Sequence, residues 1–333
     1  MKELLNRLTA AFGPAGREEK VRTLLQQELE QMGSSDAVVD DLGNLIVSRG
    51  KGIDQKILVA AHMDQIGFMV TFIEENGFLR ITPVGGIQAK SLPGMRLRFS
   101  GGIAGVIGQE KLKEEKQLNF SRLYVDIGVS NRDEAERQVQ IGDTAVFDAP
   151  LMTEGNRYIA GAMDNRAGCA VLLETLRRLP PDLPQSVYFA FTVQEEVGLR
   201  GAQAVSYRIN PNFGLAVDVT RTGDTPEPQF KTPVSLGKGP AIKIRDSSVI
   251  CHPRVTALMR QVAQQKSIPH QIEVLEQGGT DAGAIHLSRA GVPTGALSIP
   301  CRYIHTPGEM VDGADLENGV SLLLALLQTE WKW

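Results

Sequence analysis

The sequence has no excess of basic residues and no long apolar run. Its 333 residues carry 35 Lys and Arg against 39 Asp and Glu, which gives a formal net charge of −4. A protein that binds nucleic acid would be expected to show a basic patch, so this class of function is disfavoured. No uninterrupted apolar run approaches the ~20 residues needed to cross a bilayer, which disfavours a membrane protein as well.

Cysteine is scarce, and its spacing is not that of a disulfide framework. The three residues are Cys169, Cys251 and Cys301. Cys169 and Cys301 lie in apolar surroundings, so we expect buried thiols rather than disulfides or metal ligands. The first seven residues mix acidic and basic side chains where a signal peptide would need an apolar stretch. We therefore expect a soluble, cytoplasmic protein.

Two kinds of pattern follow one another along the chain. Apolar runs typical of strands buried on both faces occur at residues 57–61, 187–193, 215–219 and 293–299. Between about 71 and 155, short alternating runs are separated by glycine-rich turns, which predicts a small β-barrel. Strands that alternate with helices predict an α/β layer structure with a mostly parallel sheet. We thus expect one domain from residues 1–70 and 156–333, with an inserted barrel domain at 71–155.

The opening 35 residues are predicted to be helical. Val21, Leu25 and Leu29 recur at four-residue spacing, and Gly33 follows as a stop signal. Residues 38–47 predict a hairpin. Further helices are predicted at residues 167–179, 255–264 and 316–331.

Histidine and carboxylate side chains follow three of the predicted strands. His62 and Asp64 come directly after the first apolar run, Glu195 and Glu196 follow the second, and Asp218 lies at the end of the third. In an open parallel sheet, ligands and catalytic groups collect at the carboxyl ends of the strands. His and carboxylate side chains gathered at one edge are typical of a metal site.

Each of these segments also has an explanation without a metal. A His-x-Asp pair is usually a surface pair, and a Glu-Glu pair in a strand points to opposite faces. However, Asp164 precedes a predicted helix and His305 follows the last predicted core strand, so both could reach the same edge. The coincidence of so many ligand types favours the metal site. The remaining histidines lack this setting and are not expected to bind metal: His252, His270 and His286.

The sequence resembles the TET aminopeptidase family, also called the glutamyl or deblocking aminopeptidases. The matching segments, in the family's order, are AHMDQIGF (61–68), AMDNR (162–166), QEEVGLRG (194–201), VDV (217–219), GGTD (278–281) and YIHT (303–306). They spread over most of the chain. The resemblance implies a zinc-peptidase-like three-layer domain. It also implies a metal-dependent aminopeptidase, which hydrolyses N-terminal residues from peptides.

The resemblance implies two divalent metal ions per subunit. Asp164 would bridge them, His62 and Asp218 would complete the protein ligands of one ion, and Glu196 and His305 those of the other. Two metals about 3.5–4 Å apart need a shared carboxylate to offset their repulsion. Zinc and cobalt are the expected ions and manganese is a further option, since a mixed nitrogen and oxygen ligand set accepts all three.

The resemblance gives catalytic roles to two further carboxylates. Glu195 would act as the general base on a water molecule that bridges the metals, and Asp64 would orient His62. The second role agrees with a general feature of metal sites, because a ligating His usually donates its other ring N–H to a carboxylate, and Asp64 lies only two residues on.

The resemblance also implies a homo-oligomer. The inserted barrel would mediate dimerisation, and dimers would assemble into a hollow tetrahedral dodecamer that admits peptides and excludes folded proteins. The charged stretch 109–119 sits where the family carries a long loop, and Pro307 stands where some relatives have a second histidine.

Two alternatives stay open at this point. Glu195 and Glu196 could form the carboxyl pair of a glycoside hydrolase, such as an endoglucanase, or the chain could be a catalytically silent relative with an assembly or regulatory role. The preferred N-terminal residue is also open, with residues 278–281 and Arg221 as candidates for pocket lining.

Overall fold

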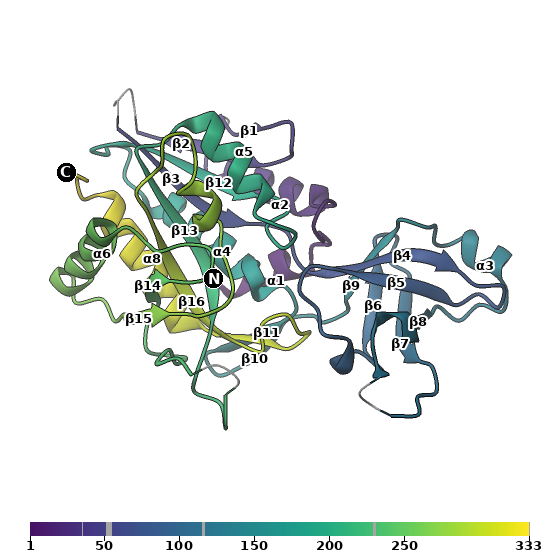
Figure 1. Ribbon diagram of the computed structural model, residues 1–333. Helices are drawn as coiled ribbons and strands as arrows, with labels where there is room; N and C mark the ends of the chain where they lie inside the picture. The colour runs from purple at the N-terminus through teal and green to yellow at the C-terminus, as the bar shows by residue number, and fades with distance from the viewer. Residues whose placement is uncertain (35, 51–54, 115–116, 229–230, 333) are drawn as a thin grey trace.

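The computed structural model describes residues 1–333 except 35, 51–54, 115–116, 229–230 and 333. A larger α/β part lies beside a smaller closed β-barrel (Figure 1). The expected combination of a helix-flanked sheet and an inserted barrel is confirmed.

One sheet of 11 strands organises the larger part. Its main path runs β1 (Val38–Val39), β2 (Leu45–Arg49), β12 (Ser186–Thr192), β3 (Lys56–His62), β13 (Phe213–Arg221), β16 (Thr294–Arg302), β17 (Glu309–Asp312), β11 (Arg157–Ala160) and β10 (Met152–Glu154). From β16 the sheet also extends to β14 (Ala241–Arg245) and β15 (Gln271–Val274). The four central strands, β12, β3, β13 and β16, are mutually parallel, while β1, β2, β17, β11 and β10 pair antiparallel. The central strands are those predicted from the apolar runs.

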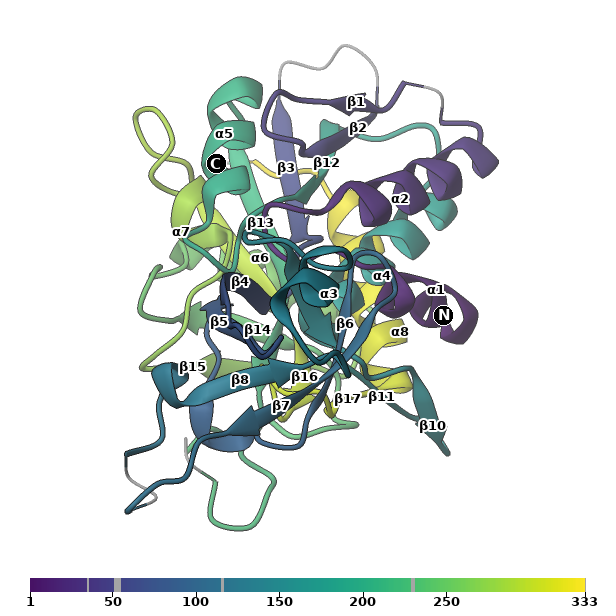
Figure 2. The ribbon, with the colours of Figure 1, turned by 90° about the vertical axis from the view of Figure 1, so that its right-hand side faces the viewer.

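Helices cover both faces of this sheet, as the second view shows (Figure 2). One face carries α1 (Lys2–Ala10), α2 (Glu19–Gln31), α4 (Met163–Arg178) and α8 (Gly313–Leu327), with α6 (Pro253–Gln265) packed against α8. The other face carries α5 (Arg200–Ile209) and α7 (Ala282–Ile285). The central strands are apolar throughout because both of their faces are buried. The predicted three-layer arrangement is therefore confirmed.

The prediction that the opening 35 residues are helical holds only in part. Residues 11–18 form no helix, and the chain turns there through Gly13, Pro14 and Gly16. Gly16 has a φ of +83°, which favours glycine. A Cβ at Gly13 would lie 2.5 Å from Val21, so the close packing of α2 requires a glycine. The buried Arg166 donates hydrogen bonds to the carbonyls of Leu8 in α1 and of Ala11 and Gly13 in this segment, and so fixes its path.

The barrel closes in the order β4 (Gly67–Ile73), β5 (Leu79–Val84), β8 (Leu123–Asp126), β7 (Ala104–Gln109), β6 (Arg96–Phe99) and β9 (Thr144–Phe147). The short helix α3 (Arg132–Glu136) precedes β9. The barrel has a separate apolar core, in which the rings of Phe68 and Phe147 meet edge to face with centroids 5.3 Å apart. The barrel strands lie between residues 67 and 147, and the following β10 and β11 belong to the main sheet. The division of the chain at 71 and 155 stays a prediction.

The three cysteines are buried and form no disulfide, as predicted. In the part of the chain that the structure describes, no helix combines the length and the apolar character that a membrane crossing requires.

Candidate metal centre

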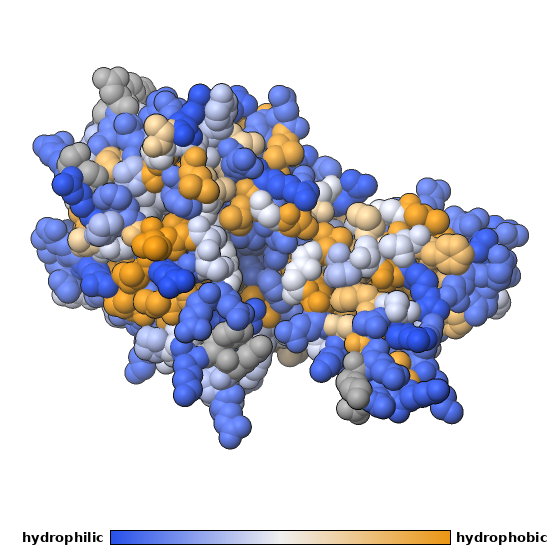
Figure 3. All heavy atoms as spheres, viewed as in Figure 1, coloured by the Kyte–Doolittle hydropathy of each residue, from blue (hydrophilic) through white to orange (hydrophobic). Residues whose placement is uncertain are grey.

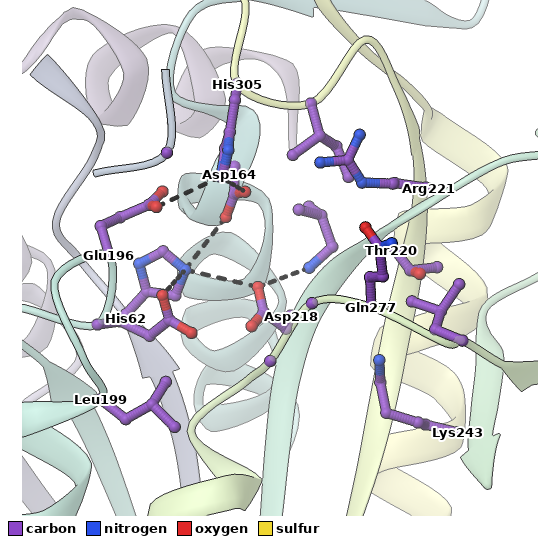
Figure 4. A pocket seen from close by; sticks show the side chains of 17 residues that line it. His62, Asp164, Glu196, Leu199, Asp218, Thr220, Arg221, Lys243, Gln277 and His305 are labelled. Carbon is purple, nitrogen blue, oxygen red and sulfur yellow. Dashed lines mark hydrogen bonds and ion pairs between the residues drawn. The ribbon is translucent and has the colours of Figure 1, made fainter. Parts of the chain in front are cut away.

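The carboxyl edge of the central parallel strands gathers the predicted site residues. His62 ends β3, Asp218 lies near the end of β13, and Glu195 and Glu196 lie in the loop after β12. Asp164 lies at the start of α4 and His305 in the turn between β16 and β17. In the close-up, the labelled ligands among them point toward one another within one pocket (Figure 4). Segments up to 243 residues apart in sequence (62 to 305) thus share one site.

His62, Asp164 and Asp218 form the first group that could hold a metal ion. The Nε2 atom of His62 lies 3.1 Å from Oδ1 of Asp164 and 3.5 Å from Oδ1 of Asp218. All three residues are buried. One ligand atom from each lies within 4.8 Å of the other two, which is compact enough for a single cation.

Asp164, Glu196 and His305 form the second group. The Nε2 atom of His305 lies 3.3 Å from Oδ2 of Asp164 and 3.3 Å from Oε2 of Glu196. Asp164 therefore belongs to both groups and turns a different carboxylate oxygen to each. Figure 4 shows Asp164 between the two histidines. This is the geometry that a shared carboxylate needs.

Glu195 belongs to neither group but lies beside the first. Its Oε2 atom is 3.9 Å from Nε2 of His62, and its side chain is only 10% exposed. A carboxylate at the edge of a metal group, without being one of its ligands, is placed to exchange protons with a bound molecule.

Asp64 contacts His62 and also holds the loop after β12. The Nδ1 atom of His62 lies 3.2 Å from the backbone carbonyl of Asp64 and 3.4 Å from its Oδ1 atom, so the hydrogen bond goes to the carbonyl. The Asp64 carboxylate instead accepts the backbone N–H groups of Glu195 and Glu196, at 3.0 and 3.1 Å. Asp64 is fully buried, so these two hydrogen bonds stabilise its charge away from water. This second contact is not evident from the sequence.

Both imidazoles of the site favour the protonated form. Burial alone would lower their pKa, but nearby carboxylates outweigh it. Glu195 and other acids hold the pKa of His62 well above its usual range. Hydrogen bonds from Asp164 and Glu196, together with the charges of the same two carboxylates, raise the pKa of His305 to about 11. The pocket thus stabilises positive charge at both histidine positions.

The pKa values of the carboxyl groups are also shifted by the excess of negative charge in the site. Burial is the largest influence on each, and with the neighbouring acids it raises the pKa of Glu195, Glu196 and Asp218. Asp164 differs: burial alone would raise its pKa, but its contacts with both imidazoles lower it. Two divalent cations would offset the mutual repulsion of these acids.

The donor set itself fits divalent cations. Two imidazole nitrogens and carboxylate oxygens suit zinc, cobalt or manganese. The Oε1 atom of Glu196 is buried and has no hydrogen-bond partner among the described residues. A buried polar atom without a partner is costly unless something binds it, and a cation in the second group would do so.

The sequence did not predict a role for two buried residues of the site, Asn44 and Glu309. Asn44 braces the loop that carries Glu195 and Glu196: its Oδ1 atom accepts the Val193 N–H at 3.0 Å, and its Nδ2 donates to the Gly201 carbonyl at 3.1 Å. Glu309 accepts the backbone N–H groups of Asp164 and His305. Asn44 and Glu309 bind backbone atoms of segments that lie more than 140 residues away in sequence. Glu309 also has a local partner, the N–H of His305 four residues before it. Contacts to backbone atoms leave no local pattern in the sequence.

A pocket opens above the two groups. Its walls include Leu199, Thr220, Arg221, Lys243 and Gln277 (Figure 4). Gly86 adds a wall from the barrel side, where a Cβ would lie 3.0 Å from Nδ1 of His305. Among the suggested lining residues, Gly278, Gly279 and Arg221 line the pocket. Asp281 is not a lining residue: its carboxylate accepts a hydrogen bond from the hydroxyl of Thr192 at 2.5 Å.

The other three histidines lie outside both groups. His252 caps α6 and accepts the Arg254 N–H at 3.3 Å. His270 and His286 contact backbone carbonyls through Nδ1, each at 3.0 Å.

Comparison with known proteins is consistent with this site. The sequence model of a family described as M42 glutamyl aminopeptidase matches residues 43–322. A putative aminopeptidase of Acetivibrio thermocellus is 46% identical over 97% of this chain and 97% of its own length. The solved structure of an aminopeptidase from the archaeon Desulfurococcus kamchatkensis has a TM-score of 0.93 and 38% identity, covering 98% of this chain and 94% of that one. The Pyrococcus horikoshii TET1 peptidase, described as assembling into a tetrahedron or a large octahedral shell, has a TM-score of 0.87 and 35% identity, with 98% of each chain covered.

Proposed function

The chain belongs to the M42 glutamyl aminopeptidase family, and we propose that it is an aminopeptidase whose site holds two divalent cations. The observation that carries the proposal is the position of Asp164, whose two oxygens face His62 on one side and His305 on the other. A carboxylate placed in this way can serve two cations at once.

The ligands are assigned from the two groups. His62, Asp164 and Asp218 would hold one cation, and Asp164, Glu196 and His305 the other. Zinc or cobalt would occupy them, with manganese as a further option. When bound, such cations polarise a peptide carbonyl and make a water molecule easier to deprotonate.

Glu195 is proposed as the general base. Its carboxylate would take the proton from the attacking water and then give it to the amine that leaves when the peptide bond breaks. Asp64 supports this role, because its carboxylate accepts the backbone N–H of Glu195 at 3.0 Å and so fixes the position of that residue. Asp64 also keeps the Nε2 face of His62 toward Asp164 through the contact with Nδ1.

The glycoside hydrolase alternative is not favoured by the geometry. A glycoside hydrolase needs two carboxyl groups that flank a sugar. Glu196, however, is turned to His305 and Asp164 and belongs to the second metal group. A silent relative is not favoured either, since both groups are complete and Glu195 stands beside them.

The proposal is tested with a panel of aminoacyl chromogenic substrates and short peptides. We expect release of the N-terminal residue, loss of this activity after chelation, and its return when zinc or cobalt is added. A β-glucan serves as the control and should not be cleaved. Activity that survives complete removal of metal would show the proposal to be wrong.

The barrel is proposed as a contact between subunits of a homo-oligomer. Support comes from the P. horikoshii TET1 peptidase, whose assembly into a tetrahedron is described, and from the barrel surface. Phe72 and Ile141 are exposed by 50% and 63%, and two hydrogen bonds between Val70 and residues 142–143 bring their segments together. Hydrophobic residues are also visible among hydrophilic ones on the barrel in the space-filling view (Figure 3).

The role of this surface is tested by measuring the molar mass in solution with light scattering. We expect the wild-type chain to have a molar mass several times its 36.2 kDa, and the Phe72→Asp variant to have a smaller one. Val38→Asp is the matched control, since Val38 is 46% exposed but lies in the α/β part. Equal masses for wild type and Phe72→Asp would contradict a role for this surface. The proposed cytoplasmic location is checked separately by cell fractionation.

A further inference from the structure

Glu309 links two ligands that come from different parts of the chain. It is the first residue of β17 and is only 1% exposed. Its Oε1 atom accepts the backbone N–H of His305 at 2.7 Å, and its Oε2 atom accepts the backbone N–H of Asp164 at 3.0 Å. One carboxylate therefore spans two residues that are 141 positions apart (164 to 305).

The backbone at both ends of this link departs from regular structure. His305 has a φ of +67°, in the left-handed region that non-glycine residues rarely adopt. Asp164 has φ −79° and ψ 102°, which are not helical values although it lies in the first turn of α4. Neither N–H group can donate within a regular helix or sheet, so each depends on Glu309 for an acceptor.

The two residues that Glu309 holds are both members of the second metal group. Asp164 and His305 present Oδ2 and Nε2 to each other at 3.3 Å, and this separation depends on where their backbones lie. The third member, Glu196, is held by Asp64 through a different hydrogen bond. Of the three members of the first group, Asp164 is the one to which a hydrogen bond of Glu309 is described.

We propose that Glu309 is a positioning residue that fixes the spacing of Asp164 and His305 and thereby sets the metal affinity of the second group. The inference rests on the two-cation site of the proposed function. It distinguishes the two cations: a change at Glu309 should weaken one site strongly and the other weakly.

The same kind of contact occurs elsewhere in this chain without any metal ligand. Asp315 is fully buried in α8, and its two oxygens accept the backbone N–H groups of Gly237 and Gly239, each at 2.7 Å. Asp315→Asn therefore removes an equivalent pair of contacts outside the metal groups. It separates the effect of losing a buried carboxylate from the effect of moving a metal ligand.

The test is a calorimetric titration of zinc into metal-free wild type, Glu309→Gln and Asp315→Asn. Glutamine keeps the size but presents one amide NH₂ group to a backbone N–H, so one of the two hydrogen bonds is lost. We expect two tight sites in the wild type, and in Glu309→Gln one site weakened by about 10–100-fold and the other weakened much less. Asp315→Asn should keep both wild-type affinities even if its melting temperature falls.

The kinetics of Glu309→Gln should depend on the zinc concentration in the same way. With zinc below saturation of the weakened site, kcat of Glu309→Gln should fall while KM for an aminoacyl substrate changes little, and added zinc should restore kcat. Two wild-type affinities in Glu309→Gln would overturn the inference. Equal weakening of metal binding by Asp315→Asn would overturn it as well.

Two further outcomes are distinguishable from these. If the wild type itself binds fewer than two zinc ions, the proposed function fails rather than the role of Glu309. If Glu309→Gln does not fold, Glu309→Asp replaces it: the carboxylate is one methylene shorter and cannot reach both N–H groups. A selective loss of affinity at one site is then expected, and wild-type affinity in Glu309→Asp would contradict the spacing role.

Discussion

Replacing Asp164 with asparagine is expected to weaken both metal sites together, so that at most one ion is held, and to lower kcat/KM by on the order of 10³-fold or more. The reason is that Asp164 is the one residue common to both groups. Asparagine keeps the shape but offers a single oxygen, and its NH₂ group cannot bind a cation. Because two-metal sites contribute several kcal/mol to catalysis and each 1.36 kcal/mol is a factor of ten, the loss should be large.

The measurement is metal content by mass spectrometry together with steady-state kinetics. Asp315→Asn is again the control, because it removes a buried carboxylate that accepts backbone N–H groups outside both groups. We expect two metal ions per chain in the wild type and the control, and at most one weakly held ion in Asp164→Asn. An Asp164→Asn variant that still holds two ions would show that Asp164 does not bridge them.

Glu195→Gln is expected to give the opposite pattern, with metal content unchanged and kcat lowered by about 10²–10⁴-fold, the usual contribution of a general base. Glutamine has the size of glutamate but cannot accept the proton from water. Glu195 is in neither metal group, so both sites should keep their ions. KM should change little, since the substituted group acts on the proton transfer rather than on substrate binding.

A matched control for this variant is Glu276→Gln. Glu276 is exposed and lies next to Leu275 and Gln277, which line the pocket, but it is not itself a lining residue. The control should retain wild-type kcat and metal content. If Glu195→Gln turns over substrate at close to the wild-type rate, another group carries the proton and the role assigned to Glu195 is wrong.

Much of the candidate site could be predicted because its residues follow buried strands. His62, Glu195 and Asp218 come after or near the end of apolar runs, and parallel strands deliver such residues to one edge of a sheet. That edge could be located from periodicity alone. The assignment of ligands to two separate cations came instead from the resemblance of the motifs to a known family.

The residues that hold the site in place could not be predicted in the same way. Asn44 and Glu309 act on backbone N–H and C=O groups, and a backbone group has no signature in the sequence. Asp64 was expected only to orient His62, yet its carboxylate also accepts the N–H groups of Glu195 and Glu196. Such contacts depend on how the loops fold against one another.

The break in the first helical region shows a similar limit. The apolar spacing of Val21, Leu25 and Leu29 gave α2 correctly. The turn at residues 11–18 depends on the close approach of Gly13 to Val21 and on the buried Arg166, whose carbonyl partners lie more than 150 positions away. Local pattern therefore predicts the elements better than the contacts between them.

The most direct measurement is a crystal structure of the zinc-loaded protein with the ions located by anomalous scattering. Two peaks about 3.5–4 Å apart are predicted, one beside His62 and Asp218 and the other beside Glu196 and His305, with Asp164 in contact with both. A single peak, or two peaks that do not share Asp164, would contradict the account.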